Sequence, residues 1–136
     1  MDEGTRFLIL SLDGENYAIP ITRLLEIMVA HNIQKDPKIM EPFEGKFEFR
    51  GTWIPVLNLK KIFKLSGSPG VTLLVIKNAR GMLGLLVEAV MDILDTEQRL
   101  IPLPNGVVNP GLRCYKGILR HKESLVLLLN EDELLS

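Results

Sequence analysis

The chain of 136 residues contains few of the side chains on which most enzymes depend. Its single cysteine, Cys114, excludes an internal disulfide and suits a reducing compartment, where we expect a buried and inert thiol. His31 and His121 have no neighbours at metal-ligand spacing, and no serine lies in a nucleophile motif. We therefore predict a protein that is not an enzyme and that uses no cofactor and no metal.

The chain also lacks an excess of charge of either sign. Its formal net charge is -1, with acids and bases interspersed. Because binding to nucleic acid requires a basic stripe, we predict no nucleic-acid partner. The densest basic cluster, Lys60, Lys61 and Lys64, is expected to be a solvated face. One acidic cluster, interpreted as a solvated strand edge rather than a cation site, comprises Asp92, Asp95 and Glu97.

Signals for export or membrane insertion are missing as well. The first residues are acidic rather than basic, which is not typical of a signal peptide. Apolar runs such as Leu125 to Leu129 are too short to cross a bilayer. We expect a cytoplasmic protein that reaches a membrane only through its partners.

What the chain does contain is a series of short apolar runs separated by turn signals, which is typical of strands. The turn Asp13–Asn16 joins two such runs, and Pro20 is expected at an edge or a strand end because it cannot donate to a ladder. Lys46–Asn58 is predicted to be a hairpin folded at Arg50–Thr52.

Two short helical segments are expected between the strands. Thr22–Ile27 is predicted to form one helical turn with Thr22 as its cap, followed by a strand to about Ile33. Asn58–Phe63 is predicted to be a second helical segment. Ser66–Gly70 is the clearest linker in the chain.

After this linker the pattern starts again, which indicates an internal duplication. A shift of 66 residues pairs Phe7–Leu10 with Leu73–Ile76, and Leu24–Ile27 with Val90–Ile93. It also pairs Phe49-Arg50-Gly51 with Tyr115-Lys116-Gly117, after which the register slips by six residues, as a longer second hairpin would require. At the new shift of 72, Ile54–Asn58 pairs with Val126–Asn130.

The duplication predicts an all-β fold of two tandem five-stranded barrels packed together, with short helical segments. Each copy is so short that one core would be marginal, and closing each sheet removes its exposed edges. We expect one domain over residues 1–136, with halves at roughly 1–65 and 66–136, and exchange of strands between the halves is left open.

Three residues near the first hairpin are candidates for contact with another protein. Arg50 stands at the hairpin tip, where a long cation can reach a partner, and Glu26 is placed to pair with it. Trp53, the only tryptophan, is of a type favoured at interface hot spots, but we expect it to fill a core.

The ordered set of these segments resembles the CheW-like domain of bacterial chemotaxis, from about residue 6 to 135. The residues that carry the resemblance are Phe7–Leu10, Tyr17–Ile21, Leu24–Ile27, Arg50-Gly51, Ile54–Leu59, Gly84–Val90, Tyr115–Ile118 and Leu125–Leu129. The resemblance implies two SH3-like barrels. It also implies an adaptor that couples chemoreceptors to the histidine kinase CheA without catalysing a reaction.

Two partners follow from the resemblance. One is the regulatory domain of CheA, itself CheW-like, which would bind by barrel-to-barrel contact. The other is the helical cytoplasmic tip of a chemoreceptor, which would dock in an apolar groove between the barrels. Because the chain ends just after the domain and has no kinase segments, we expect a stand-alone coupling protein. The positions that match family positions tied to coupling are Leu24, Glu26, Gly45, Arg50 and Gly84.

Other functions stay open at this point. The chain could be a CheW-like module with a partner outside chemotaxis, or a coupling protein of another chemosensory pathway. A small nucleic-acid-binding β-barrel and a sensor with a ligand between the barrels are further alternatives.

Overall fold

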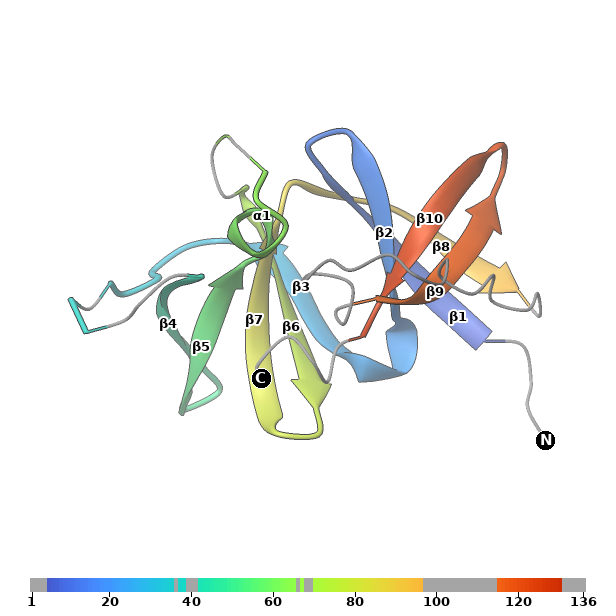
Figure 1. Ribbon diagram of the computed structural model, residues 1–136. Helices are drawn as coiled ribbons and strands as arrows, with labels where there is room; N and C mark the ends of the chain where they lie inside the picture. Colours follow the sequence, from blue (N-terminus) through green and yellow to red (C-terminus); the bar gives the residue numbers. More distant parts are fainter. Residues whose placement is uncertain are drawn as a thin grey trace.

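The protein folds into two five-stranded antiparallel-rich sheets, each curled into a barrel (Figure 1). The computed structural model describes residues 5–35, 37–38, 42–65, 67, 70–96 and 115–130. The strands are β1 (Thr5–Leu12), β2 (Glu15–Pro20), β3 (Leu24–Val29), β4 (Phe43–Phe49), β5 (Thr52–Asn58), β6 (Thr72–Asn78), β7 (Gly81–Val87), β8 (Ala89–Thr96), β9 (Tyr115–His121) and β10 (Ser124–Leu129). A 3₁₀ turn, η1 (Ile21–Arg23), and a short helix, α1 (Leu59–Ile62), complete the described elements. The predicted all-β fold is confirmed.

Each sheet takes strands from both halves of the sequence. The strand order is β8-β1-β2-β10-β9 in what we name the first barrel, and β3-β6-β7-β5-β4 in the second. After β2 the chain leaves the first barrel, and β3 pairs with β6; after β7 it returns, and β8 pairs with β1. Exchanging each strand with the one five places along the chain converts one order into the other. The duplicated sequence therefore builds a pseudo-symmetric pair of barrels with exchanged strands.

The repeat register differs from the expectation at one point. The turns Arg50–Gly51 and Lys122–Glu123 both contain two residues, so the second hairpin is not longer than the first. A shift of 72 superposes β4 on β9, which places Gly45 at Gly117, whereas Lys116–Gly117 lies inside β9 and is no turn. The predicted pairing of Lys116–Gly117 with the Arg50–Gly51 tip is therefore wrong. The six additional residues fall between β8 and β9, outside the described residues.

Local geometry follows the sequence closely around the helical segments, with one correction. Pro20 ends β2, as expected of a residue that cannot donate to a ladder. The predicted helical turn over Thr22–Ile27 with a cap at Thr22 is wrong, because η1 ends at Arg23 and has no side-chain cap. Leu24 already begins β3, which ends at Val29 rather than near Ile33. Asn58 caps α1 by accepting a hydrogen bond from the Lys60 N–H at 3.0 Å, within the predicted helical segment.

The buried apolar side chains form three clusters, and both faces of β1 and of β6 contribute to them. Leu8 and Leu10 of β1 join Leu74 and Ile76 of β6 in a cluster that spans both barrels. The alternating neighbours on the same strands fill the barrel interiors. Phe7 and Ile9 lie in the first barrel, and Leu73 and Val75 in the second. Both faces of each strand are thus buried, as in strands that read as unbroken hydrophobic runs.

An ion pair lies at the point where the chain returns from the second barrel to the first. Glu88, the one residue between β7 and β8, has its Oε2 2.5 Å from the Nζ of Lys60, whose side chain is only 4% exposed. The Asp13 N–H donates to the other carboxylate oxygen at 2.6 Å, and the Glu88 N–H donates to the Ser11 carbonyl at 3.2 Å. One carboxylate thus links α1, the β7–β8 connection and the β1–β2 turn.

The expected solvated face is therefore wrong at Lys60, although Lys61 and Lys64 are exposed. A buried ammonium is tolerated only with a counter-charge. Because the hydrogen bonds from Lys60 and from the Asp13 N–H favour the charged carboxylate, they lower the pKa of Glu88.

We expect the Glu88→Gln substitution to lower the melting temperature at pH 7 by several degrees, because it leaves the Lys60 ammonium without its counter-charge. A lowered folded-state pKa means that the stabilisation is complete above the ordinary glutamate value of 4.5 and is lost as the pH falls through the folded value. Calorimetric melting between pH 7 and pH 3 should show the difference from wild type shrinking at the acid end. Glu123→Gln, in an exposed turn, is the control. Equal melting temperatures at pH 7 would contradict the role of Glu88.

Candidate functional site

The tip of the β4–β5 hairpin presents a cation in an uncommon backbone conformation. Arg50 has φ 49° and Gly51 has φ 84°, as in the tight turns whose twist suits a hairpin. A left-handed conformation costs a non-glycine residue about 1 kcal/mol or more, and such residues gather at functional sites. The Arg50 side chain is 69% exposed. The hairpin therefore holds a guanidinium outside the barrel, where another protein can reach it.

Arg50 and Glu26 come together, as the sequence predicts. The Arg50 Nη2 lies 3.1 Å from the Glu26 Oε1, which joins the hairpin tip to β3. The Arg50 guanidinium also lies 4.7 Å from the centre of the Phe49 ring. An exposed ion pair of this kind contributes about 0–1 kcal/mol to stability. Folding gains little from the pair, so its charges remain available to a partner.

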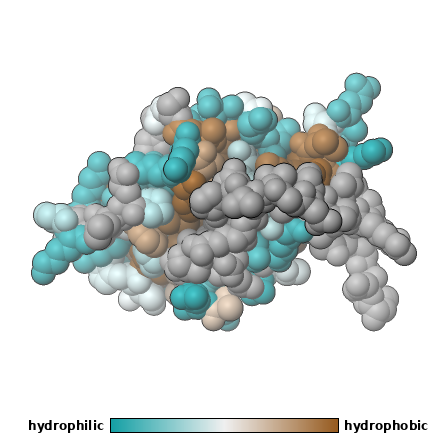
Figure 2. Space-filling model, in the orientation of Figure 1, coloured by the Kyte–Doolittle hydropathy of each residue, from teal (hydrophilic) through white to brown (hydrophobic). Residues whose placement is uncertain are grey.

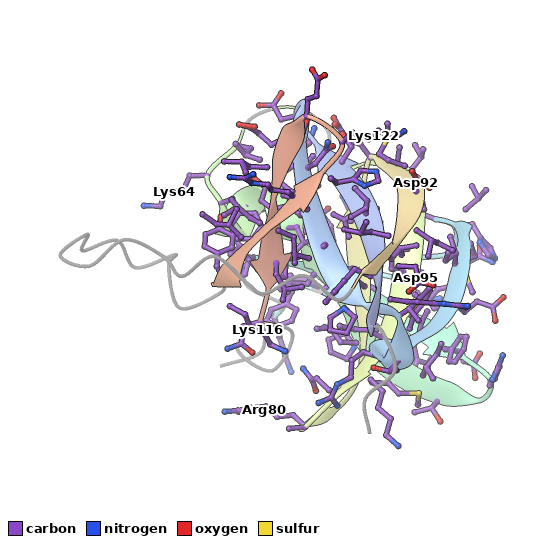
Figure 3. All side chains as sticks on the ribbon, turned by 90° about the vertical axis from the view of Figure 1, so that its right-hand side faces the viewer. Lys64, Arg80, Asp92, Asp95, Lys116 and Lys122 are labelled. Carbon is purple, nitrogen blue, oxygen red and sulfur yellow. The ribbon has the colours of Figure 1, made fainter. Side chains whose placement is uncertain are left out.

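The first barrel carries an equivalent pair that the sequence comparison overlooked. Lys122, at φ 59°, has its Nζ 3.8 Å from the Asp92 Oδ2, and the His121 Nε2 lies 3.2 Å from the same oxygen. Figure 3 shows Lys122 at the tip of its hairpin, above Asp92 on β8. The Ile93 N–H and then the His121 side chain lower the pKa of Asp92. In the corrected register Lys122 is the counterpart of Arg50, and Asp92 that of Glu26, which is the signal that would have found this pair.

Exposed apolar residues flank Glu26 and Asp92 along their strands. On β3, Leu25 is 39% and Ile27 is 44% exposed, and on β8, Met91 and Ile93 are 58% and 53% exposed. These are equivalent positions on the two edge strands. Exposed apolar residues beside charged ones on a sheet edge are typical of protein-binding surfaces.

Trp53 is not a core residue, and the expectation that it fills a core is wrong. It is 48% exposed, and the Lys46 Nζ lies 4.9 Å from the centre of its ring. The residue stands at the start of β5, directly opposite Glu48 on β4. The ring therefore lies on the outer face of the hairpin that carries Arg50.

The remaining predicted site residues lie off this surface. Leu24 packs against the cluster shared by the barrels, and Gly45 and Gly84 are buried. A Cβ at Gly84 would lie 3.1 Å from the Leu73 side chain. Their part in coupling stays a prediction, because their observed contacts support the barrels from within.

Gly45 permits the closure of the second barrel. Residues Gln34 and Lys46 exchange two backbone hydrogen bonds, of 2.8 and 2.9 Å, which join the segment after β3 to β4. A Cβ at Gly45 would lie 2.3 Å from the Gln34 carbonyl oxygen. Only glycine allows the two backbones to approach in this way.

Among the described residues, no group of three or more histidine, cysteine, aspartate or glutamate side chains could hold a metal. The same part of the chain contains no helix long and apolar enough to span a bilayer. Cys114, Glu97 and residues 131–136 lie outside the described residues.

Comparison with known proteins gives one consistent result. The family model described as CheW-like domain matches residues 6–136. The chemotaxis protein CheW of Klebsiella aerogenes is 25% identical over 137 residues, which cover 98% of this chain and 82% of that protein. The chemotaxis protein CheW of Treponema pallidum is 27% identical over 143 residues, which cover 99% of this chain and 84% of that protein. The crystal structure of the scaffolding protein CheW from Thermoanaerobacter tengcongensis superposes with a TM-score of 0.87 at 24% identity, covering 100% of this chain and 90% of that one.

We expect Gly45→Ala to lower the free energy of unfolding by about 1–3 kcal/mol, because the added methyl group would displace the Gln34 backbone and open the second barrel. Urea denaturation measures the change. Gly14→Asn is the matched control, since Gly14 has φ 82° with nothing within 4 Å of a Cβ, and asparagine tolerates this conformation. Equal losses in the two variants would contradict the close approach at Gly45.

Proposed function

The chain belongs to the CheW-like domain family, and from this premise we propose that it is a non-catalytic adaptor that couples chemoreceptors to a CheA-type histidine kinase. The observation that carries the proposal is the match of the family model to residues 6–136, nearly the whole chain. The relatives from Klebsiella aerogenes and Treponema pallidum both bear the name chemotaxis protein CheW. An adaptor of this kind works in the cytoplasm and joins membrane receptor arrays through its partners.

We propose that the kinase contact lies at the end of the second barrel that carries the β4–β5 turn, which we name the turn end. The family mode is barrel-to-barrel contact with the kinase regulatory domain. What supports the location is the exposed Arg50–Glu26 pair, together with the exposed apolar residues Leu25 and Ile27, which flank Glu26 in β3. The charged pair fixes orientation and the apolar residues supply buried area, which is the usual division of roles in an interface.

The receptor contact belongs to the seam between the barrels. Three stacked rings lie there: Tyr17 of β2 and Phe63 after α1 have centroids 5.2 Å apart, and Phe63 and Tyr115 of β9 have centroids 5.3 Å apart. Phe63 and Tyr115 are only partly buried, and they join Ile62 and Leu65 against the shared core. Figure 2 shows hydrophobic surface over and beside α1 on this face. A partly exposed apolar seam fits one face of an amphipathic receptor helix.

The decisive experiment is a calorimetric titration of the host's CheA regulatory domain with wild type and with Arg50→Glu. We expect the substitution to weaken binding about 30-fold or more, since disrupting a close interfacial charge pair costs about 2–5 kcal/mol. Stability should change by less than about 1 kcal/mol, because the intramolecular pair is exposed.

Lys122→Glu is the matched control, because it reverses the equivalent charge at the tip of the other barrel. Wild-type affinity in Arg50→Glu would leave the adaptor function standing and move the contact elsewhere. Absence of binding by the wild-type protein would remove the coupling function.

A further inference from the structure

The outer face of the β4–β5 hairpin holds the largest exposed aromatic side chain among the described residues. Trp53 is 48% exposed, while the next residues inward on β5, Ile54 and Val56, are 2% and 0% exposed. Because successive side chains of a strand point to opposite faces, Trp53 points away from the barrel interior that Ile54 and Val56 fill. Its exposure therefore follows from its position in the strand and not from fraying of the strand end. A tryptophan with this exposed fraction keeps a large apolar area in contact with water, and binding of a partner would bury that area.

The position of the ring is already defined before any partner binds. Lys46 lies over its face at 4.9 Å, and the register places Trp53 opposite Glu48 across a ladder closed by a two-residue turn. A side chain held in this way loses little conformational freedom on binding, which favours an anchoring role over an incidental one.

The charges around Trp53 indicate what kind of surface it meets. β5 and β7 run parallel, with Val56 beside Gly84, so the β4–β5 and β6–β7 turns lie at one end of the second barrel. Arg80 lies in the β6–β7 turn, Lys77 lies near the end of β6, and both are exposed. Together with Lys46 and Arg50, these cations outnumber Glu26 and Glu48 at this turn end.

The equivalent end of the first barrel has the same backbone and a different surface. Leu125 stands in the position of Trp53 and Ser11 in that of Lys77. The exposed acids Asp13 and Glu15 lie in the β1–β2 turn and at the start of β2. The two turn ends point in opposite directions: Figure 1 shows the β1–β2 and β9–β10 turns at the top and the β4–β5 and β6–β7 turns at the bottom, and Figure 3 shows Lys122 at the top and Arg80 at the bottom. A partner with an apolar pocket and an acidic rim can therefore distinguish between them.

We propose that Trp53 is the anchor of the kinase contact, inserting its ring into an apolar pocket with an acidic rim on the CheA regulatory domain. The inference rests on the proposed function and adds the anchoring residue, the chemistry of the pocket and the reason why the second barrel is selected over the first. Trp53 and Arg50 stand on the same hairpin, three residues apart.

Because Trp53 is the only tryptophan, 5-fluorotryptophan labelling gives the full chain a single ¹⁹F resonance at this position. We expect titration with the unlabelled regulatory domain to move this resonance and to reduce its shift difference between H₂O and D₂O, as burial of the ring requires. Trp53→Ala should weaken binding at least about 30-fold, in the range of interface hot spots. Its melting temperature should stay near that of wild type, since the ring contributes little to the core.

Leu125→Ala is the matched control, because it truncates the exposed apolar residue at the equivalent position of the other barrel. We expect it to retain wild-type affinity. The double variant Lys77→Glu/Arg80→Glu tests the acidic rim. It should weaken binding about tenfold or more and flatten the salt dependence.

The outcomes separate this inference from the function on which it rests. Calorimetric binding with an unmoved ¹⁹F resonance and full affinity in Trp53→Ala would overturn the anchor and leave the coupling function intact. Full affinity in the double charge variant would overturn the acidic rim. If the wild-type chain does not bind the regulatory domain at all, both the anchor and the coupling function fail.

Discussion

Burial of both faces of β1 and β6 is the constraint on which the rest of the structure depends. One face of each strand fills its own barrel, and the other face forms the layer between the barrels. Neither barrel could be exposed to water alone without uncovering a complete row of leucine and isoleucine side chains. The exchange of β3–β5 and β8–β10 between the halves follows the same logic, since the chain crosses from one barrel to the other twice, after β2 and after β7.

A charged contact accompanies this apolar layer at one of the crossings. The Lys60 ammonium is buried where α1 meets the β7–β8 connection, and the Glu88 carboxylate compensates it while accepting the Asp13 N–H. Apolar contacts are not directional and allow packed elements to shift relative to one another, whereas an ion pair with defined hydrogen bonds does not. The pair therefore fixes how the connection, the helix and the first turn lie relative to one another.

Duplication gave the two barrels hairpin ends with the same backbone arrangement, and substitutions made the surfaces of these ends different. Arg50 with Glu26 and Lys122 with Asp92 retain the same geometry, including the left-handed turn residue. Around them the surfaces have diverged, with a tryptophan at one end and a leucine at the other. An adaptor that must hold different partners benefits from this arrangement, because the scaffold stays fixed while each end is adjusted by exposed side chains that cost little stability.

The sequence by itself determined most of the strands, the hairpin at Arg50–Gly51, the duplication and the Glu26–Arg50 pair. These depend on local periodicity, on turn chemistry and on residues that recur at a fixed shift. It could not determine which strands pair across the halves, or that Lys60 is buried and Trp53 exposed. Amphipathic strands look alike whichever sheet they join, and the burial of a side chain depends on elements distant in the chain. Only the tertiary structure, by bringing Glu88 to Lys60 and leaving the outer face of β5 uncovered, decided those environments.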